Sequence, residues 1–315
     1  MTIKMKTTEQ KIESYSLKAV SGKTLSRFEA IRGACEIEAR SQMPFREATQ
    51  AVAEYGASCG TDGSVDTTPS FDYTNEFRVP FTMDNLENVL LLTNDVSRFT
   101  ETDRSCGLHI HLKAQSLVGA SLETKNGVRR LAKVISCLLS ASKRYELAFY
   151  GLSGQRDRKT NGYSSPVSAS VFAHMKQRAS DAIGLQDLAI GSRTSFLNLT
   201  NLANRNYSPS ERTIEFRCFN ATSSNRGFNK TEILNAKHIE CAFFMILNLV
   251  STAMSETANL DKLRFTNKHP LAEKSFQWFC HHSVKRPLID RWKDIDIVRG
   301  LISYAWKQNI YADRI

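Results

Sequence analysis

Short stretches of alternating apolar and ionisable residues recur through the first two thirds of the chain. Residues 34–40, 107–113 and 213–219 each carry two ionisable residues at positions i and i+2, with apolar residues between them. Successive side chains of a β-strand point to opposite faces, so each pair shares one face. The pairs are Glu36 with Glu38, His109 with His111, and Glu215 with Arg217. The pattern predicts three amphipathic strands.

Two further segments show the same alternation. Residues 75–79 set Glu76 and Arg78 against apolar neighbours, and residues 195–200 place Asn198 and Thr200 on one side. Each segment alone is typical of a strand whose polar face meets water. Together they would form a dense array of carboxylate, imidazole and guanidinium groups, and paired carboxylates repel unless a cation covers them. The set of strands indicates a site for metal and phosphate.

Helical spacing dominates the rest of the chain. Residues 127–150 place six apolar side chains on one stripe, which predicts a helix. Residues 231–250, much of the chain beyond them, and a segment before Ile31 also favour helices. Strands followed by long helices that pack on them make an α+β fold. Because the chain has no internal repeat and no long linker, we expect a single domain over residues 1–315, large enough to be a catalytic domain. Its core spans about 31–255, with extensions at 1–30 and 256–315.

Composition indicates the cellular location of the protein more clearly than its function. The 315 residues are 41% hydrophobic and 23% charged, as in ordinary globular proteins. Lysine and arginine exceed the acidic residues by 42 − 32 = 10, so the surface attracts anions without specifying which. Seven scattered cysteines with no CxxC pair favour reduced thiols. The longest apolar stretch, residues 241–250, falls short of the ~20 residues of a membrane span. We therefore expect a cytoplasmic protein with no membrane partner.

The order of these segments resembles the amidoligase family, carboxylate–amine ligases related to glutamine synthetase and glutamate–cysteine ligase. The resemblance runs over residues 32–222, through CEIE, GTDGSV, NEFRVP, CGLHIHL, RDRKTNGY, FLNLTNL and TIEFRCFNAT. It implies a curved antiparallel sheet that carries ATP and Mg²⁺ or Mn²⁺ on its concave face and is backed by helices. It also implies ATP-dependent amide formation through an acyl phosphate, with small-molecule, peptide or protein carboxylates and amines as substrates.

The resemblance also assigns roles to individual residues. Metal ligands would be Glu36, Glu38, Glu76, His109 and Glu215, and contacts to ATP would come from Arg156, Arg158, Lys159, His111 and Asn198. Arg217 would clamp the transferred phosphoryl group, and Asp62 would hold or deprotonate the incoming amine. General chemistry agrees with these roles, because Mg²⁺ prefers oxygen ligands and arginine grips phosphate oxygens in a two-pronged fork.

Two other functions remain open on the sequence alone. A metal-dependent hydrolase or nuclease would use His109 and His111 to hold zinc or manganese near the two glutamates of the first strand. A nucleic-acid-binding protein would exploit the excess positive charge. A zinc site built on Cys106 is disfavoured, since no second pair of ligands has structural-zinc spacing, and we expect Cys106 to be a small buried residue.

Overall fold

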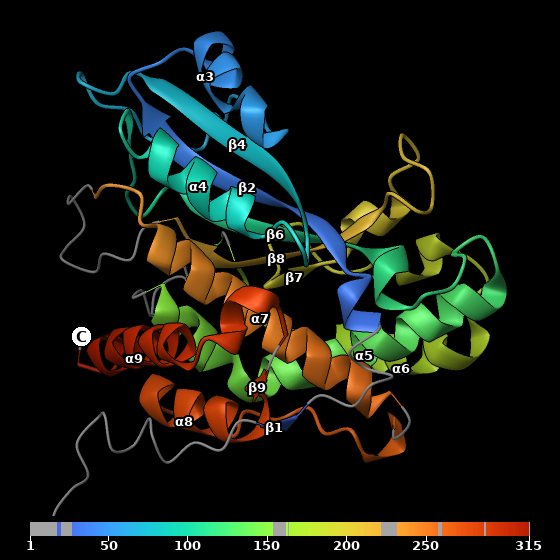
Figure 1. Cartoon of the computed structure of the whole chain (residues 1–315). Helices are drawn as coiled ribbons and strands as arrows, with labels where there is room; N and C mark the ends of the chain where they lie inside the picture. Colours follow the sequence, from blue (N-terminus) through green and yellow to red (C-terminus); the bar gives the residue numbers. More distant parts are fainter. Residues whose placement is uncertain are drawn as a thin grey trace, which may run out of the picture.

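An antiparallel sheet forms the centre of the molecule (Figure 1). The computed structural model describes residues 18–19, 27–153, 162, 164–221, 232–257, 260–286 and 288–314. Within them, six strands follow the order β3 (Ser58–Gly60), β4 (Tyr73–Thr82), β2 (Arg32–Ser41), β6 (Gly107–Lys113), β8 (Thr213–Asn220) and β7 (Leu197–Asn198). The seventh, β5 (Thr100–Glu101), pairs with the end of β2. A separate parallel pair joins β1 (Lys18–Ala19) to β9 (Lys285–Arg286).

Helices cover the apolar face of this sheet in two layers. The inner layer is α5 (Lys125–Leu152) and α7 (Ala236–Glu256), and the outer layer is α8 (Ala272–His282) and α9 (Ile295–Ala312). The flanking helices are α3 (Phe45–Val52), α4 (Glu87–Val96) and α6 (Ala169–Asp181). Short 3₁₀ turns complete the chain: η1 (Ala53–Tyr55), η2 (Ala114–Leu117), η4 (Leu185–Leu188), η5 (Thr200–Ala203), η6 (Leu260–Lys262) and η7 (Asp290–Lys293). The predicted α+β layout is confirmed. Of the helix expected before Ile31, residues 27–29 are helical and the earlier part lies outside the described residues.

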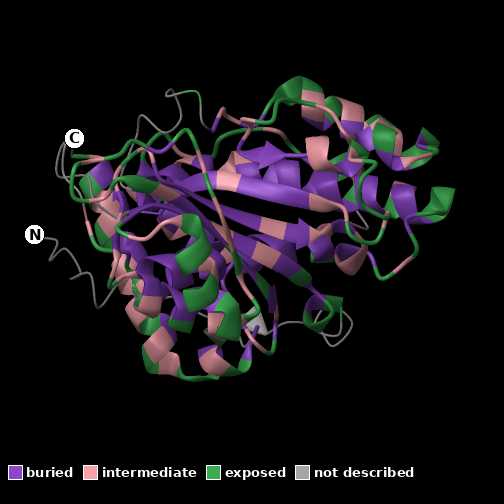
Figure 2. Ribbon diagram, turned by 90° about the horizontal axis from the view of Figure 1, so that it is seen from above, coloured by how far each residue is buried: buried purple, intermediate pink, exposed green. Residues whose placement is uncertain are grey.

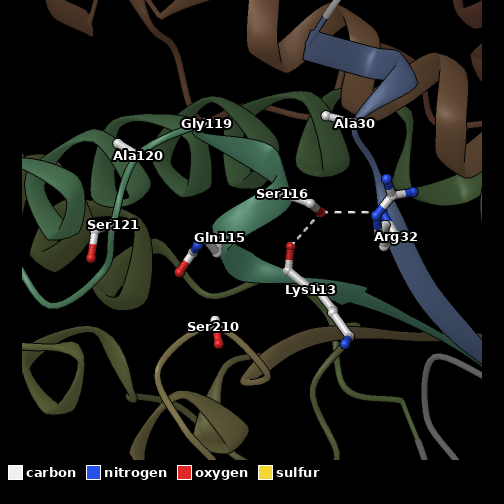
Figure 3. Close-up of a pocket in the computed structure, with 9 residues that line it drawn as sticks. All are labelled: Ala30, Arg32, Lys113, Gln115, Ser116, Gly119, Ala120, Ser121 and Ser210. Atoms are coloured by element: carbon white, nitrogen blue, oxygen red, sulfur yellow. Dashed lines mark hydrogen bonds between the residues drawn. The ribbon is translucent and has the colours of Figure 1, made fainter.

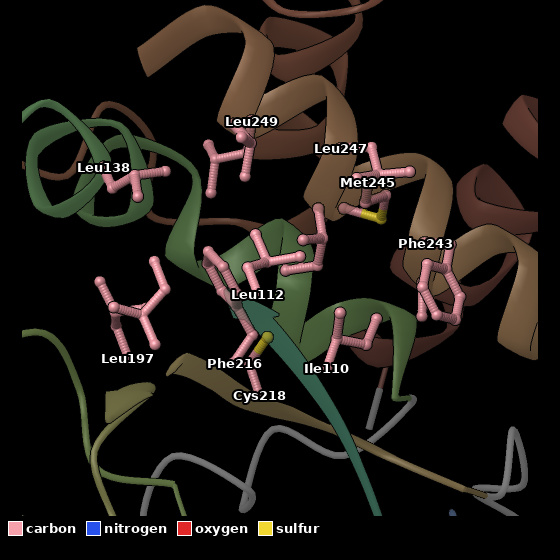
Figure 4. Close-up of a cluster of buried hydrophobic side chains, with 14 of the residues drawn as sticks. Ile110, Leu112, Leu138, Leu197, Phe216, Cys218, Phe243, Met245, Leu247 and Leu249 are labelled. Atoms are coloured by element: carbon pink, nitrogen blue, oxygen red, sulfur yellow. The ribbon is translucent and has the colours of Figure 1, made fainter. Parts of the chain in front are cut away.

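The core lies between the sheet and the inner helices. Ile110 and Phe216 point from β6 and β8 toward Phe243 and Leu247 of α7 (Figure 4). These side chains are the apolar members of the alternating strands, so the periodicity assigned the faces correctly. Figure 2 shows that the strands are buried or intermediate along most of their length, whereas exposed residues gather on outer helices and loops. The polar face of the sheet is therefore largely screened from water as well.

Helix α7 is longer than the apolar run of residues 241–250. Ala236–Glu256 is 21 residues long and apolar enough, by length and composition, to cross a membrane. The apolar run of residues 241–250 is shorter than the helix because Glu240 precedes it and Ser251 and Thr252 follow it. In the structure, 94% of the most apolar 18-residue window is buried inside the protein. The hydrophobicity of α7 is accounted for by its central place in the core.

Burial of His238 predicts a loss of stability in acid. His238 on α7 is fully buried between the carbonyl oxygen of Asn220 and the hydroxyl of Tyr304, and burial lowers its pKa from 6.5 to about 4. Between these values the unfolded chain binds a proton that the folded protein does not. The free energy of unfolding should therefore fall by roughly 3 kcal/mol as pH drops from 6.5 to 4.

Urea denaturation across this pH range tests that prediction. His238→Gln should remove the histidine share of the pH dependence, because glutamine does not titrate there. His281→Gln, at an exposed residue, controls for the general effect of replacing a histidine by glutamine. A wild-type pH dependence that survives intact in His238→Gln would show that other groups cause it.

Candidate metal centre

Polar side chains from adjacent strands lie in register on one face of the sheet. Because β2 runs between β4 and β6, Glu36 stands opposite both Arg78 and His109. Two residues further along β2, Glu38 pairs with Glu76 of β4. Three strands thus contribute three carboxylates, an imidazole and a guanidinium to one patch.

The next strand extends the patch on its other side. On β8, Glu215 stands opposite His111 of β6 and opposite Asn198 of β7. Arg217 follows Glu215, and its Nη1 lies 2.5 Å from Glu215 Oε1 and 3.5 Å from His109 Nδ1. The structure therefore brings together the ionisable pairs of all four strands that the sequence singled out.

The first group that could hold a cation consists of Glu36, Glu38 and His109. His109 Nδ1 lies 2.9 Å from Glu36 Oε1 and 3.6 Å from Glu38 Oε1. One ligand atom from each of the three residues lies within 4.8 Å of the other two. Ligands of one ion at bond lengths near 2.1 Å lie at most about 4.2 Å apart, so small side-chain rotations would close the site.

A second group shares Glu36 with the first. Glu36, His111 and Glu215 also place one ligand atom each within 4.8 Å of one another. His111 Nε2 lies 3.4 Å from Glu36 Oε2 and 3.8 Å from Glu215 Oε1. The two carboxylate oxygens of Glu36 face different histidines, so this residue can bridge two neighbouring cations.

Burial makes this cluster costly without a cation. Glu38, Glu76, His109 and Glu215 are each 5% exposed or less. Two arginines, Arg78 and Arg217, offset some of the negative charge. Buried charges left without compensation destabilise a fold by several kcal/mol, so this group of neighbouring glutamates favours either a bound cation or protonation of some of its carboxyl groups.

The pKa values in the cluster move in opposite directions. Burial opposes ionisation of Glu36, yet the hydrogen bonds and charges of His109 and His111 outweigh it and hold the Glu36 pKa below its ordinary value. Burial and the adjacent Glu36 raise the pKa of Glu76 to about 8. Neighbouring carboxyl groups with divergent pKa values are common at functional sites.

Glu215 is held in place by a network of its own. Asn198 Nδ2 donates to Glu215 Oε2 at 2.6 Å, and Asn198 Oδ1 accepts from the backbone and hydroxyl of Thr200. Strand β7 has only two residues, so Thr200 does not share a strand face with Asn198, as the alternation suggested, but begins η5. Asn201, which the sequence did not reveal, lies 3.5 Å from Glu215 Oε2. The structure thus places Asn198 where it orients Glu215.

Gly107 is a second residue that sequence patterns missed. It precedes His109 on the same face of β6, and its backbone N–H donates to Glu38 Oε2 at 2.5 Å. A Cβ at this position would lie 2.6 Å from His109 Nε2 and 2.7 Å from Glu38 Oε2. The missing side chain therefore makes room for two members of the first group.

We expect Gly107→Ala to damage the cluster. The added methyl must displace His109 or Glu38, which should cost about 1–3 kcal/mol of stability and lower Mn²⁺ affinity by roughly 10–100-fold. Calorimetric titration with Mn²⁺ measures the second effect. Gly63→Ala is the control, because nothing lies within 4 Å of a Cβ there. Unchanged Mn²⁺ affinity in Gly107→Ala would mean that the cation does not use this group.

The other sequence-predicted residues fall into two sets. Asp62 lies beside Glu38, accepts a hydrogen bond from Ser64 N at 2.6 Å, and so forms the expected Asp-Gly turn at the edge of the cluster. Cys106 is fully buried, as expected, and belongs to neither candidate metal group. The basic loop with Arg156, Arg158 and Lys159 lies outside the described residues.

An open pocket of about 390 Å³ adjoins the second group. Ala34, Glu36 and His111 line its sheet side, and Tyr207 and Arg212 line its other side, in the loop between η5 and β8. Arg212 fixes this loop by donating to the carbonyl oxygens of Tyr207 and Leu202. We call this cavity the metal-side pocket.

No family model matches the chain, and no curated protein matches it.

Proposed function

We propose that this protein is an ATP-dependent carboxylate–amine ligase that forms an amide through an acyl phosphate. The main support is the buried array in which two potential cation groups share Glu36 while Arg217 contacts Glu215 and lies beside His109 of β6. Phosphoryl transfer depends on positioning and charge neutralisation rather than covalent help from the protein. Metal ligands beside an arginine and an open pocket supply those needs.

The reaction requires two successive displacements. An oxygen of the substrate carboxylate attacks the γ-phosphorus, the bond to the β–γ bridging oxygen breaks, and ADP leaves. The amine nitrogen then attacks the acyl carbon, loses a proton, and inorganic phosphate leaves. We assign Arg217 to the oxygens of the transferred group and Asp62, at the edge of the cluster, to the ammonium of the incoming amine. Both assignments follow the family resemblance, and charge complementarity agrees with them.

The residues present fit a divalent cation. Each group combines carboxylate oxygens with one imidazole nitrogen, a mixture that suits Mn²⁺ better than Mg²⁺, which prefers oxygen alone. When bound, the cation would neutralise phosphate charge and orient the nucleotide. Asn198 and Arg217 both contact Glu215, and thereby set the direction of its oxygens toward such an ion.

Finer features of the proposal follow the family resemblance. We propose that the antiparallel sheet is of the type found in glutamine synthetase and glutamate–cysteine ligase, with the active site on its polar face. Arg156, Arg158 and Lys159 would bind nucleotide phosphates, and His111 would contact the nucleotide as well as the second cation.

A second candidate is a metal-dependent hydrolase or nuclease. The observation that favours it is a histidine in each potential metal group, since imidazole suits Zn²⁺ and Mn²⁺. Such an enzyme would act without ATP and without an amine.

Product analysis separates the two functions. The protein is incubated with Mn²⁺, ATP and a library of carboxylates, with and without a library of amines. The ligase releases ADP and phosphate in equal amounts, and only when a suitable acid and amine are both present. Hydrolysis of phosphate esters or amides in the absence of ATP would contradict the ligase and support the second candidate.

Cation binding should stabilise the folded protein. A ligand that binds only the native state adds about 2.7 kcal/mol at a concentration 100-fold above its Kd. We therefore expect Mn²⁺ to raise the melting temperature by several degrees, and ATP with Mn²⁺ to raise it further. NaCl at equal ionic strength is the control for the general effect of salt. A melting temperature that stays unchanged in millimolar Mn²⁺ would argue against the metal centre.

A further inference from the structure

A second pocket lies further along the same face of the sheet. It has a volume of about 400 Å³ and is lined by Arg32 of β2, Lys113 of β6, Gln115 and Ser116 of η2, and Ser210 (Figure 3). We call it the basic pocket. Ser210 belongs to the same loop as Tyr207 and Arg212, so one loop borders both pockets.

The strand register connects the basic pocket to the metal centre. On β2, Arg32, Ala34 and Glu36 follow at every second position and share a face, and Lys113 and His111 do the same on β6. Four residues separate Arg32 from Glu36, a distance of about 13 Å at ~3.3 Å per residue. Ala34 lies between them and lines the metal-side pocket. On this face of β2, the only side chain between Arg32 and Glu36 is therefore a methyl group.

The structure gives the two cations of the basic pocket no ion-pair partner among the residues it describes. Among the described residues, no carboxylate lies within ion-pair distance of Arg32 or Lys113, whereas both arginines of the metal centre are paired with glutamates. Ser116 ties the two strands together, because Arg32 N donates to Ser116 Oγ and Ser116 Oγ donates to the carbonyl oxygen of Lys113 (Figure 3). Ser116 therefore joins β2 to β6 at the pocket, and Arg32 and Lys113 give the pocket a positive charge.

We propose that the basic pocket binds a carboxylate at the far end of an extended acid substrate whose reacting carboxylate lies at the metal centre. This inference rests on the proposed function and adds a substrate class to it: an elongated acid with two carboxylates about 13 Å apart. Arg32 binds the distal carboxylate with its planar fork, and Lys113 adds a second charge. The serine and glutamine side chains hydrogen-bond polar groups beside it. A short peptide with an acidic first residue has the required length, since four extended residues span about 13 Å.

Matched peptides test the distal carboxylate directly. The probes are N-acetylated peptides of two to six residues that begin with glutamate and continue with glycine, each made with a free C-terminal carboxylate and with a C-terminal amide. Binding is measured by calorimetry with and without Mn²⁺. We expect the free acid to bind roughly 10–100-fold more tightly than the amide, with the largest ratio near four residues.

Substitutions assign that ratio to the pocket. Arg32→Gln and Lys113→Gln, made separately, should each weaken binding of the free-acid peptide and leave binding of the amide unchanged. The ratio of the two affinities should then fall toward one. Arg98→Gln removes the same charge from an exposed site at the end of α4 and should preserve the ratio. Equal binding of acid and amide by the wild type, or a ratio that survives both pocket substitutions, would overturn the proposal.

The design separates failure of the pocket from failure of the proposed function. A ratio that depends on Arg32 but not on Mn²⁺ supports the pocket and counts against the metal centre. Mn²⁺-dependent binding with equal acid and amide affinities supports the metal centre and counts against the pocket. ADP binding is titrated in parallel. If Arg32→Gln weakens ADP binding as much as it weakens binding of the free-acid peptide, the pocket binds a nucleotide phosphate, and the assignment to a substrate carboxylate is wrong.

Discussion

Glu36→Gln should weaken binding of Mn²⁺ to this protein at least about 100-fold. Glu36 contributes a ligand atom to both candidate groups, and its two oxygens face His109 and His111 separately. Glutamine keeps the volume but removes the negative charge from both groups at once. Changes in residues that merely orient metal ligands cost 10–100-fold in affinity, so loss of a shared ligand should cost at least about 100-fold. Mn²⁺ titration followed by electron paramagnetic resonance measures the effect.

Two companion substitutions make this result specific. Glu38→Gln removes a carboxylate from the first group only, and Glu215→Gln removes one from the second only. Each should weaken Mn²⁺ binding in part. Glu123→Gln makes the same chemical change on an exposed residue and should have no effect. If Glu36→Gln binds Mn²⁺ no worse than either companion, Glu36 is not shared between two sites.

The face that each residue occupies on the four long strands, β2, β4, β6 and β8, could be predicted from sequence, because the two-residue period of a strand does not depend on its neighbours. The local pattern alone therefore predicts the correct sheet face for the two glutamates of β2, Glu36 and Glu38, and for the two histidines of β6. Their neighbours could not be found in this way. That β2 lies between β4 and β6, with Glu36 opposite both Arg78 and His109, depends on contacts between residues far apart in sequence. The layout of ligand atoms is a property of that strand order.

Two local departures from regular strand geometry also escaped the pattern. Leu108 pairs with Phe219 while Ile110 pairs with Phe216, so β8 has one residue more than β6 across His109. This bulge lies at Arg217, and bulges often redirect a side chain beside an active site. Gly107 gave no signal because a glycine contributes nothing to an alternation of side chains. Its role became visible only when Glu38 and His109 were found in the space beside it.

Arg217→Lys should reduce turnover by roughly 10²–10³-fold and change ATP affinity much less. If Arg217 binds the γ-phosphoryl group while the bond to ADP breaks, its planar array of donors is required, and lysine offers only a point charge. Such a contact strengthens in the transition state, so the loss falls on kcat rather than on KM for ATP. The structure places the guanidinium between Glu215 and His109, beside both candidate groups.

A purely structural Arg217 predicts a different result. If it only offsets the charge of Glu215, lysine keeps that charge and should preserve most of the turnover. Arg299→Lys, an exposed arginine paired with Asp296, controls for the general effect of the exchange. Steady-state kinetics on folded variants distinguish the two roles, because charge pairing and phosphoryl transfer make different demands on the same side chain. Near-normal kcat, or a defect confined to KM for ATP, would leave Arg217 with a part in the stability of the sheet and none in the transfer step.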